Sequence, residues 1–246
     1  IQEIQKIPQK VIDQLVMMGF NPDGIEKVEE GYRIERDIII TDEFLATSGY
    51  GVEAPNNARY STTNLVNAGT GRVITIYASE RGNSGYSPKM LEGLDEAIAR
   101  YNAENLLITF QRITNAKKAD ILMTKFSKRQ EVNGALGSAG FPTAGDPYSE
   151  IKLSGVLDYY SVDLIATVIA HEIGHCIGLR HTDYYDRSIS CGGDPVNETA
   201  GTLGANLVPG TPAIATLEEA SYMLSCLNGT NRPFTSYDKI ALDYLY

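Results

Sequence analysis

The chain has 246 residues, which suits one large domain, or a domain of about 190 residues behind a short accessory segment. Acidic residues number 31 and basic residues 21, giving a net charge of -10. This balance disfavours binding to nucleic acid or to anionic membranes, because both require basic patches. No apolar run approaches the roughly 18 residues of a membrane helix, so we expect no membrane insertion. The expected partner is therefore a protein or a small molecule.

Residues 1–50 differ in pattern from the rest of the chain. Apolar residues recur at helical spacing over residues 10–20 and predict a short helix. Two short β-like runs follow at 32–34 and 38–41, and residues 48–57 are loop-forming. We therefore place a boundary between residues 48 and 60, with an accessory segment at 1–50 and the main domain at 60–246.

From Arg72 onward, strand and helix patterns alternate, which indicates an α/β domain. Ser87 and Pro88 are typical of a helix start. The residues from 134 to 155 are rich in Gly, Pro and Ser and predict an edge strand that loops out and returns. The predicted elements are strands at 72–79, 106–114 and 119–126, helices at 87–105 and 162–178, and a C-terminal helix at 236–246 with Ile240, Leu242 and Leu245 as docking residues.

The chain has three cysteines, Cys176, Cys191 and Cys226. Cys191 and Cys226 lie in Gly- or Ser-rich stretches, a setting that suits a disulfide between two loops. Closing the loop between them would stabilise the fold by about 3–4 kcal/mol in the chain-entropy model. The alternative is two free thiols in a reducing compartment.

The three histidines of the chain all lie within residues 171–181, HEIGHCIGLRH. On a helix, His171 and His175 are separated by about 40° around the axis and about 6 Å along it, so both imidazoles can face one ion. Gly178 can adopt a positive φ, end the helix and return His181 toward the same ion. Three neutral imidazoles leave an open fourth position, which is typical of catalytic zinc.

Glu172 follows the first of these histidines and lies about 100° further around the helix. There its carboxylate can reach a water at the metal without binding the metal itself, as a general base does. Cys176 lies about 140° from His171, so we expect a buried core thiol. The alternative is a buried helix with incidental histidines, since an apolar stripe is present anyway: Leu164, Val168, Ile169, Ile173 and Ile177. That alternative requires five specified positions within eleven residues to match a metal-site pattern by chance.

The 171–181 stretch resembles the long zinc signature of the metzincin metallopeptidases. The resemblance implies zinc as cofactor, a twisted mixed sheet, a long active-site helix and a methionine-bearing turn beneath the metal. Ser221-Tyr222-Met223 is similar to that turn, which makes Met223 the expected methionine. Astacins and serralysins carry a zinc-reaching tyrosine two residues later, where this chain has Ser225.

The resemblance covers roughly residues 70–246. GSAGFP at 137–142 is similar to the matrixin substrate-binding edge, and the last eleven residues are similar to the C-terminal helix of the clan. Within the clan, three features most resemble the bacterial dual-action HEIGH metallopeptidases: the HEIGH form of the signature, the SCGG loop at 190–193, and the cysteine after the methionine turn.

Residues 1–50 resemble a pro-segment. Astacin pro-segments place an Asp from a Phe-x-Gly-Asp pattern on the zinc, and Ile34-Glu35-Arg36-Asp37 is similar, with Arg36 in place of glycine. Asp37 is thereby the expected latency switch; the alternative is a solvated Asp ahead of a strand. A cysteine switch is excluded for this segment, because no cysteine precedes Cys176.

These observations together predict a secreted zinc endopeptidase in latent zymogen form. The expected substrates are proteins or peptides bound in extended form along the edge strand, and we expect a monomer. The chain begins at Ile1 without a signal-type segment, so we expect any targeting peptide to be absent. Two alternatives remain: a non-proteolytic zinc hydrolase, and an inactive metal-bound module that binds other proteins.

Overall fold

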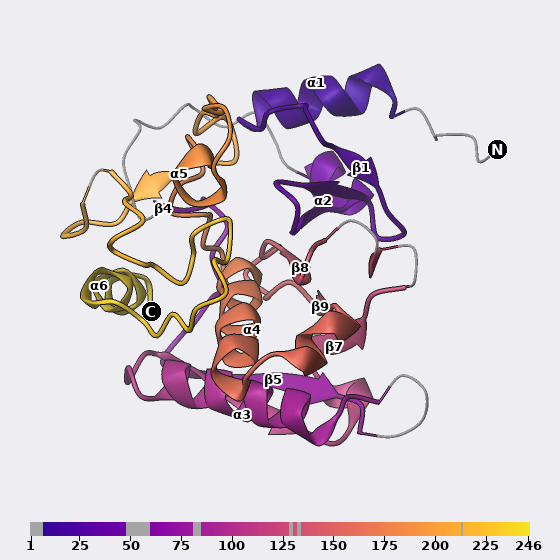
Figure 1. The fold of residues 1–246 in the computed structure, drawn as a ribbon, viewed down its shortest axis with the longest axis vertical. Helices are drawn as coiled ribbons and strands as arrows, with labels where there is room; N and C mark the ends of the chain where they lie inside the picture. Colours follow the sequence, from indigo (N-terminus) through magenta and orange to yellow (C-terminus); the bar gives the residue numbers. More distant parts are fainter. Residues whose placement is uncertain (1–6, 48–59, 81–84, 128–129, 132–133, 213) are drawn as a thin grey trace.

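The computed structural model describes residues 7–47, 60–80, 85–127, 130–131, 134–212 and 214–246 (Figure 1). The loop predicted at 48–57 lies outside the described residues. Within the described ranges, no helix combines the length and the apolar character needed to cross a bilayer.

The fold is mixed α/β and is organised around one eight-stranded sheet with the order β1-β2-β3-β8-β9-β7-β5-β6. Pairing is parallel from β9 through β7 and β5 to β6, whereas β8 runs antiparallel to β9. The strand bounds are β1 Glu26–Lys27, β2 Tyr32–Ile34, β3 Ile38–Ile40, β5 Arg72–Ala78, β6 Ile108–Ile113, β7 Ile121–Lys125, β8 Gly137–Gly140 and β9 Glu150–Leu153. A small second sheet pairs β4 (Tyr60–Ser61) with β10 (Asn206–Leu207).

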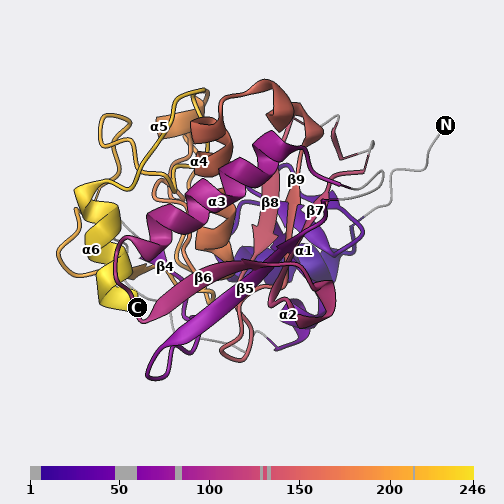
Figure 2. The same cartoon turned by 90° about the horizontal axis from the view of Figure 1, so that it is seen from below.

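Two long helices, α3 (Pro88–Asn102) and α4 (Val162–Cys176), lie side by side against the sheet (Figure 2). Each begins at a serine whose side chain accepts a hydrogen bond from a backbone N–H of the first turn, Ser87 for α3 and Ser161 for α4. Their apolar residues join those of β5, β6, β7 and β9 in the main hydrophobic core. The shorter helices are α1 Gln9–Met17, α2 Asp42–Thr47, α5 Ser188–Cys191 and α6 Ser236–Leu245.

The C-terminal helix α6 forms as predicted, but one of its three expected docking residues is wrong. Leu242 is fully buried and Leu245 packs against the main core, whereas Ile240 is 39% exposed. The buried face of α6 is set by Asp238, Ala241 and Leu242, and Ile240 lies off that face.

The strand β8 is not at the edge of the sheet, which corrects the sequence-based prediction. β3 pairs with it in parallel, with Ile38 opposite Ala139 and Ile39 opposite Gly140. The N–H of Ala139 donates to the carbonyl oxygen of Asp37 at 3.0 Å. The N-terminal segment therefore extends the sheet by three strands and covers the edge that β8 would otherwise expose.

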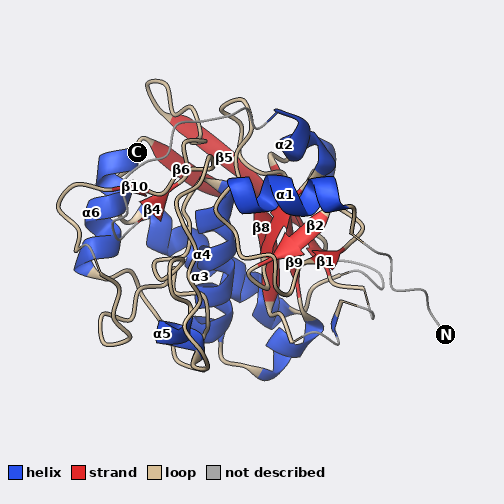
Figure 3. Cartoon of the chain, turned by 90° about the horizontal axis from the view of Figure 1, so that it is seen from above, coloured by secondary structure: helices blue, strands red, loops and turns tan. Residues whose placement is uncertain are grey.

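A second hydrophobic cluster holds the N-terminal segment in place. Leu15 of α1, Ile34 of β2 and Ile38 of β3 pack with Phe141 and Leu203, which lie far along the chain. Helix α1 crosses over this end of the sheet (Figure 3). Residues 7–47 are thus packed onto the main domain through apolar side chains as well as through backbone pairing.

The close approach of α3 and α4 generates a prediction about Gly93. A Cβ at this position would overlap the side chain of Ile165 in α4. Alanine favours helices over glycine by about 1 kcal/mol, yet we expect Gly93→Ala to lower the free energy of unfolding by about 1–3 kcal/mol, because overpacking outweighs propensity. Urea denaturation measures this effect. Glu92→Ala, at the exposed neighbouring position, is the control, and equal stability of the two variants would contradict the argument.

Candidate metal centre

Helix α4 presents His171 and His175 one turn apart, with ring centroids 4.7 Å from each other. The helix ends at Cys176, and Gly178, two residues later, has a φ of 106°. A Cβ at Gly178 would lie 2.5 Å from the carbonyl oxygen of Asn64, so both the backbone conformation and the close approach require glycine. The predicted turn is confirmed, and the chain after it carries His181 back to α4.

The three imidazoles converge through their Nε2 atoms. His175 Nε2 lies 3.1 Å from His171 Nε2, and His181 Nε2 lies 3.2 Å from each of the other two. Asp37 Oδ2 completes the group, 3.2 Å from His181 Nε2 and 3.4 Å from His171 Nε2. The sequence-predicted residues His171, His175, His181 and Asp37 are therefore brought together at one point.

The opposite nitrogen of each ring has an oxygen acceptor. His171 Nδ1 lies 2.7 Å from the carbonyl oxygen of Tyr222, and His175 Nδ1 lies 2.8 Å from that of Leu179. His181 Nδ1 lies 2.7 Å from Glu35 Oε2. Because each Nδ1–H donates outward, each Nε2 directs a lone pair toward the same point.

This arrangement fits zinc. Zinc–nitrogen bonds of about 2.0–2.1 Å in a tetrahedron place neighbouring ligand atoms about 3.3–3.4 Å apart, close to the 3.1–3.2 Å separations between the Nε2 atoms. Converging lone pairs repel one another unless a cation lies between them. The other oxygen of Asp37, Oδ1, is buried without a hydrogen-bond partner. The donor set of three imidazoles and one carboxylate is a known zinc ligand combination.

The electrostatics of the centre favour a positive charge there. Burial by itself lowers the pKa of His181, but Asp37 and Glu35 raise it to about 10. Burial opposes ionisation of Asp37, yet the positive charges and hydrogen bonds of His181 and His171 lower the pKa of Asp37 below its usual value. A bound zinc ion takes the place of the proton that these carboxylates stabilise, so metal binding releases protons.

Glu172 lies beside the centre without joining the ligand cluster. Its side chain is buried, Oε2 has no hydrogen-bond partner, and a Cβ at Gly137 of β8 would overlap Oε1. Burial, followed by the negative charge of Asp37, raises the pKa of Glu172 well above its usual value.

The turn from Ser221 to Met223 packs under the three histidines. A Cβ at Gly174 of α4 would lie 2.5 Å from Met223 Sδ, so glycine allows the methionine to approach the helix. The N–H of Thr182 donates to the carbonyl oxygen of Met223 at 2.8 Å. Ser225 donates its hydroxyl to Asp183 Oδ1 at 2.8 Å and is not part of the ligand cluster.

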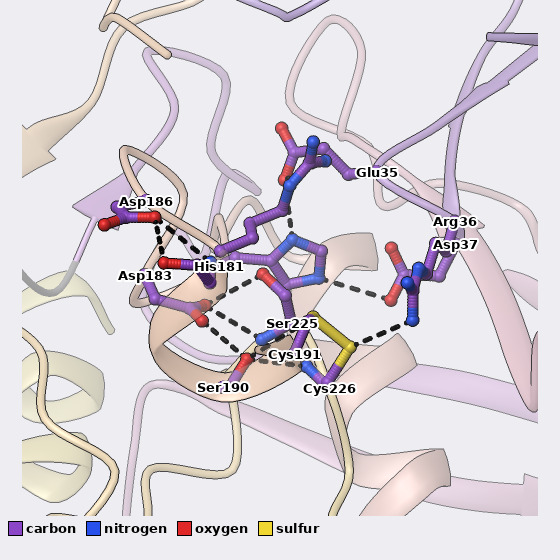
Figure 4. The surroundings of a disulfide bond; sticks show 12 residues. Glu35, Arg36, Asp37, His181, Asp183, Asp186, Ser190, Cys191, Ser225 and Cys226 are labelled. Carbon is purple, nitrogen blue, oxygen red and sulfur yellow. Dashed lines mark hydrogen bonds and ion pairs between the residues drawn. A yellow bond between two sulfur atoms is a disulfide. The ribbon is translucent and has the colours of Figure 1, made fainter. Parts of the chain in front are cut away.

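Cys191 and Cys226 form the expected disulfide (Figure 4). Cys176 is a buried free thiol, as predicted. Ser190 Oγ donates to Asp183 Oδ2 at 2.6 Å and accepts from the N–H of Cys226 at 2.9 Å. The disulfide and these hydrogen bonds together join the segment after His181 to the segment after Met223.

Glu35 is the residue that sequence reasoning missed. Its carboxylate is 1% exposed, contacts His181 Nδ1, and lies 3.5 Å from Arg180 Nη2 and 3.9 Å from Arg187 Nη1. Although burial alone would raise the pKa of Glu35, the hydrogen bond and positive charge of His181, with the two arginines, lower it to about 2. Glu35 contacts Nδ1 of His181 and Asp37 contacts Nε2, so each ring nitrogen has its own carboxylate (Figure 4).

A left-handed turn positions these two carboxylates. Glu35 has a φ of 49° and Arg36 a φ of 81°, a region that favours glycine. A glycine would adopt this conformation with less strain than Arg36 does. The Arg36 side chain is exposed and its Nη1 donates to Cys226 Sγ at 3.2 Å. For Glu35, the only sequence signal was its position two residues before Asp37, since no local pattern indicates contact with His181.

A cavity of about 150 Å³ opens beside the centre. Its wall includes His171 and Glu172 of α4, residues 134–137, and Arg36 and Asp37 of the N-terminal segment. The segment 222–232 also contributes, including Leu227 and Arg232.

The fold and the cluster of three histidines and a carboxylate define the site of a zinc-dependent metallopeptidase that acts on proteins or peptides. The chain belongs to the dual-action HEIGH metallo-peptidase family, whose model matches residues 32–246. This confirms the narrower resemblance drawn from the HEIGH form, the SCGG loop and the cysteine after the methionine turn.

A search of curated proteins gives no match. Among solved structures, one of myroilysin aligns at 16% identity with a TM-score of 0.44, over 75% of this chain and 96% of that chain. A crystal structure of myroilysin aligns at 14% identity with a TM-score of 0.31, over 59% of each chain.

The disulfide predicts a pattern of cysteine reactivity. In the native protein, Cys191 and Cys226 should resist alkylation until a reductant is added. Cys176, which is fully buried, should react only on unfolding. Mass spectrometry of the alkylated protein measures both effects, and labelling of Cys191 without reductant would show that the bridge is not formed.

Proposed function

We propose that this protein is a secreted zinc endopeptidase and that the intact chain is its latent zymogen, with residues 1–50 as the pro-segment and residues 60–246 as the catalytic domain. The observation that carries the proposal is the convergence of three imidazole nitrogens and Asp37 Oδ2 at one point, with Glu172 beside it. The disulfide supports an oxidising, extracellular location, and the net charge of -10 supports a protein partner rather than a nucleic acid.

In this proposal, His171, His175 and His181 hold the zinc, and the acceptors on their Nδ1 atoms fix the orientation of each ring. The zinc supplies Lewis-acid polarisation of the scissile carbonyl and makes water more acidic. Glu172 accepts a proton from the attacking water and then donates it to the leaving amine, which completes the hydrolysis. Met223 supports the histidines from below through its contact with α4.

The substrate would bind along β8. In the intact chain β3 lies there and pairs through Ile38 and Ile39. Once the pro-segment leaves, the free backbone groups of β8 can take an extended peptide as an added strand. In this proposal, β8 becomes an edge strand only after the pro-segment leaves.

Latency would arise from three contacts of one short segment. Asp37 occupies the fourth ligand position, Glu35 binds His181 with Arg180 and Arg187, and β3 blocks the substrate strand. Activation requires a cut between the pro-segment and the catalytic domain, in residues 48–60, as the domain boundary predicts.

The role of Glu172 is tested by replacing it. Glu172→Ala should keep its zinc and its fold and lose at least about 100-fold in rate, because a positioned general base is removed. Zinc content by atomic absorption and peptide hydrolysis after activation measure the two effects. Glu218→Ala, at an exposed position, is the control. Substantial residual hydrolysis by Glu172→Ala would sink the assignment.

The latency contacts are tested in the uncut chain. Asp37→Ala should raise basal hydrolysis or autoprocessing, since the fourth ligand position opens. Glu35→Gln should give a smaller rise, because glutamine still accepts from His181 but no longer neutralises Arg180 and Arg187. Asp42→Ala, whose carboxylate lies in the same segment and is 73% exposed, is the matched control.

Hydrolysis of a peptide by each variant, before and after a cut within residues 48–59, provides the comparison. The cut should activate every variant to the same final rate, because the pro-segment no longer contributes. If the intact wild-type chain already works at the rate of the cut form, residues 1–50 are not a pro-segment.

A further inference from the structure

Arg232 is a buried cation, and two of its three guanidinium nitrogens have no hydrogen-bond partner among the residues that the structure describes. It is 2% exposed, and its Nε and Nη2 atoms are both buried and unpaired. Its backbone N–H donates to Thr167 Oγ1 of α4 at 3.0 Å, which fixes the position of the residue beside the active-site helix. A buried guanidinium is costly unless it is paired, so a missing partner is expected to come from outside the chain.

Arg232 also lines the cavity that opens beside the catalytic centre. The same cavity is lined by His171 and Glu172, so its occupant lies next to the reacting bond. Its volume of about 150 Å³ far exceeds the roughly 10–15 Å³ that one water requires, so it admits a side chain. Several apolar residues complete the wall: Val168, Leu224 and Leu227.

The two acidic residues whose charges act on Arg232 already accept hydrogen bonds from other groups. Asp183 and Asp238 both act on its charge electrostatically. Asp183 accepts hydrogen bonds from Ser190 and Ser225, and Asp238 accepts from Ser221 and Thr235.

The pro-segment does not neutralise this charge either. The pro-segment residues in the cavity wall are Arg36 and Asp37, and Asp37 is directed at the histidines. Arg36 carries the same sign of charge as Arg232. The positive site in the cavity is therefore left for the substrate.

We propose that Arg232 is a specificity-determining residue that binds a substrate carboxylate, so that the enzyme cleaves beside an acidic residue. This inference rests on the proposed function and names its substrate class. The guanidinium offers a fork of N–H donors that matches a carboxylate in geometry and charge. The carboxylate comes either from an Asp or Glu side chain within the peptide or from a free C-terminus, and the same contact recognises both.

The net charge of -10 does not oppose this preference at the site. At physiological ionic strength, charges beyond about 8 Å are largely screened. The local cation therefore dominates over the acidic surface of the chain.

The test uses the zinc-loaded full chain activated by a cut within residues 48–59. One peptide set has an amidated C-terminus and differs only in Glu against Gln, or Asp against Asn, at each position flanking the scissile bond. A second set differs only in a free against an amidated C-terminus. We expect kcat/KM to be about 10- to 100-fold higher for the peptide that carries the carboxylate. The preference appears in the first set if Arg232 binds an acidic side chain, and in the second set if it binds a free C-terminus.

The preference should disappear in Arg232→Met and be partly kept in Arg232→Lys. Arg112→Met, which removes an equal charge from β6 where the arginine pairs with Glu80 and Asp95, should leave it unchanged. Equal cleavage of Glu and Gln peptides together with equal cleavage of free and amidated termini overturns the inference. A preference that survives in Arg232→Met overturns it as well.

Two further measurements separate this inference from the proposed function. Efficient cleavage of neutral peptides without preference contradicts the role of Arg232 alone, whereas failure to cleave any peptide contradicts the endopeptidase proposal. In the second case, binding of labelled Glu and Gln peptides to the cut Glu172→Ala chain, measured by fluorescence anisotropy, still decides the role of Arg232. Tighter binding of the Glu peptide supports it, and equal binding overturns it.

Discussion

The outward hydrogen bonds of the three imidazoles are the interaction on which the site depends. Each Nδ1 is held by an oxygen from a different segment: Tyr222 from the turn under the helix, Leu179 from the turn at Gly178, and Glu35 from the N-terminal segment. These bonds leave three Nε2 lone pairs directed at one point, and only a cation relieves their repulsion. The rest of the fold positions those three oxygens. Helix α4 packs into the core, Gly178 provides the turn, and the disulfide with Asp183 ties the surrounding loops together.

The N-terminal segment is built into the same arrangement instead of lying on its surface. It extends the sheet along β8, buries an apolar cluster with Phe141, and brings Glu35 and Asp37 to the two ring nitrogens of His181. In the proposed zymogen, removing this segment would open the strand edge and the fourth ligand position together. It would also take away the acceptor of His181 Nδ1, which would then bind water or another oxygen. On that proposal, the contacts that block the site and those that order it are partly the same.

Elements with strong local signals were predictable from the sequence. Helix α3 has its serine cap and proline, α4 its apolar stripe and histidine spacing, and both lie where the pattern placed them. The convergence of His171, His175 and His181 followed from helix geometry and one glycine. Long-range pairing was not predictable: β8 reads as an edge strand, because nothing in its own residues records that β3 pairs with it. The role of Glu35 was hidden for the same reason, since a φ of 49° and a contact with a residue far along the chain leave no periodic trace.

The most direct test of the central claim is X-ray absorption spectroscopy at the zinc edge, on the intact chain loaded with one equivalent of zinc. The account predicts three imidazole nitrogens at about 2.0–2.1 Å and one carboxylate oxygen at about 2.0–2.2 Å, with no sulfur scatterer at about 2.3 Å. Asp37→Ala should keep the three imidazoles and exchange the carboxylate for water. A first shell with fewer than three imidazoles, or one that contains sulfur, would contradict the account.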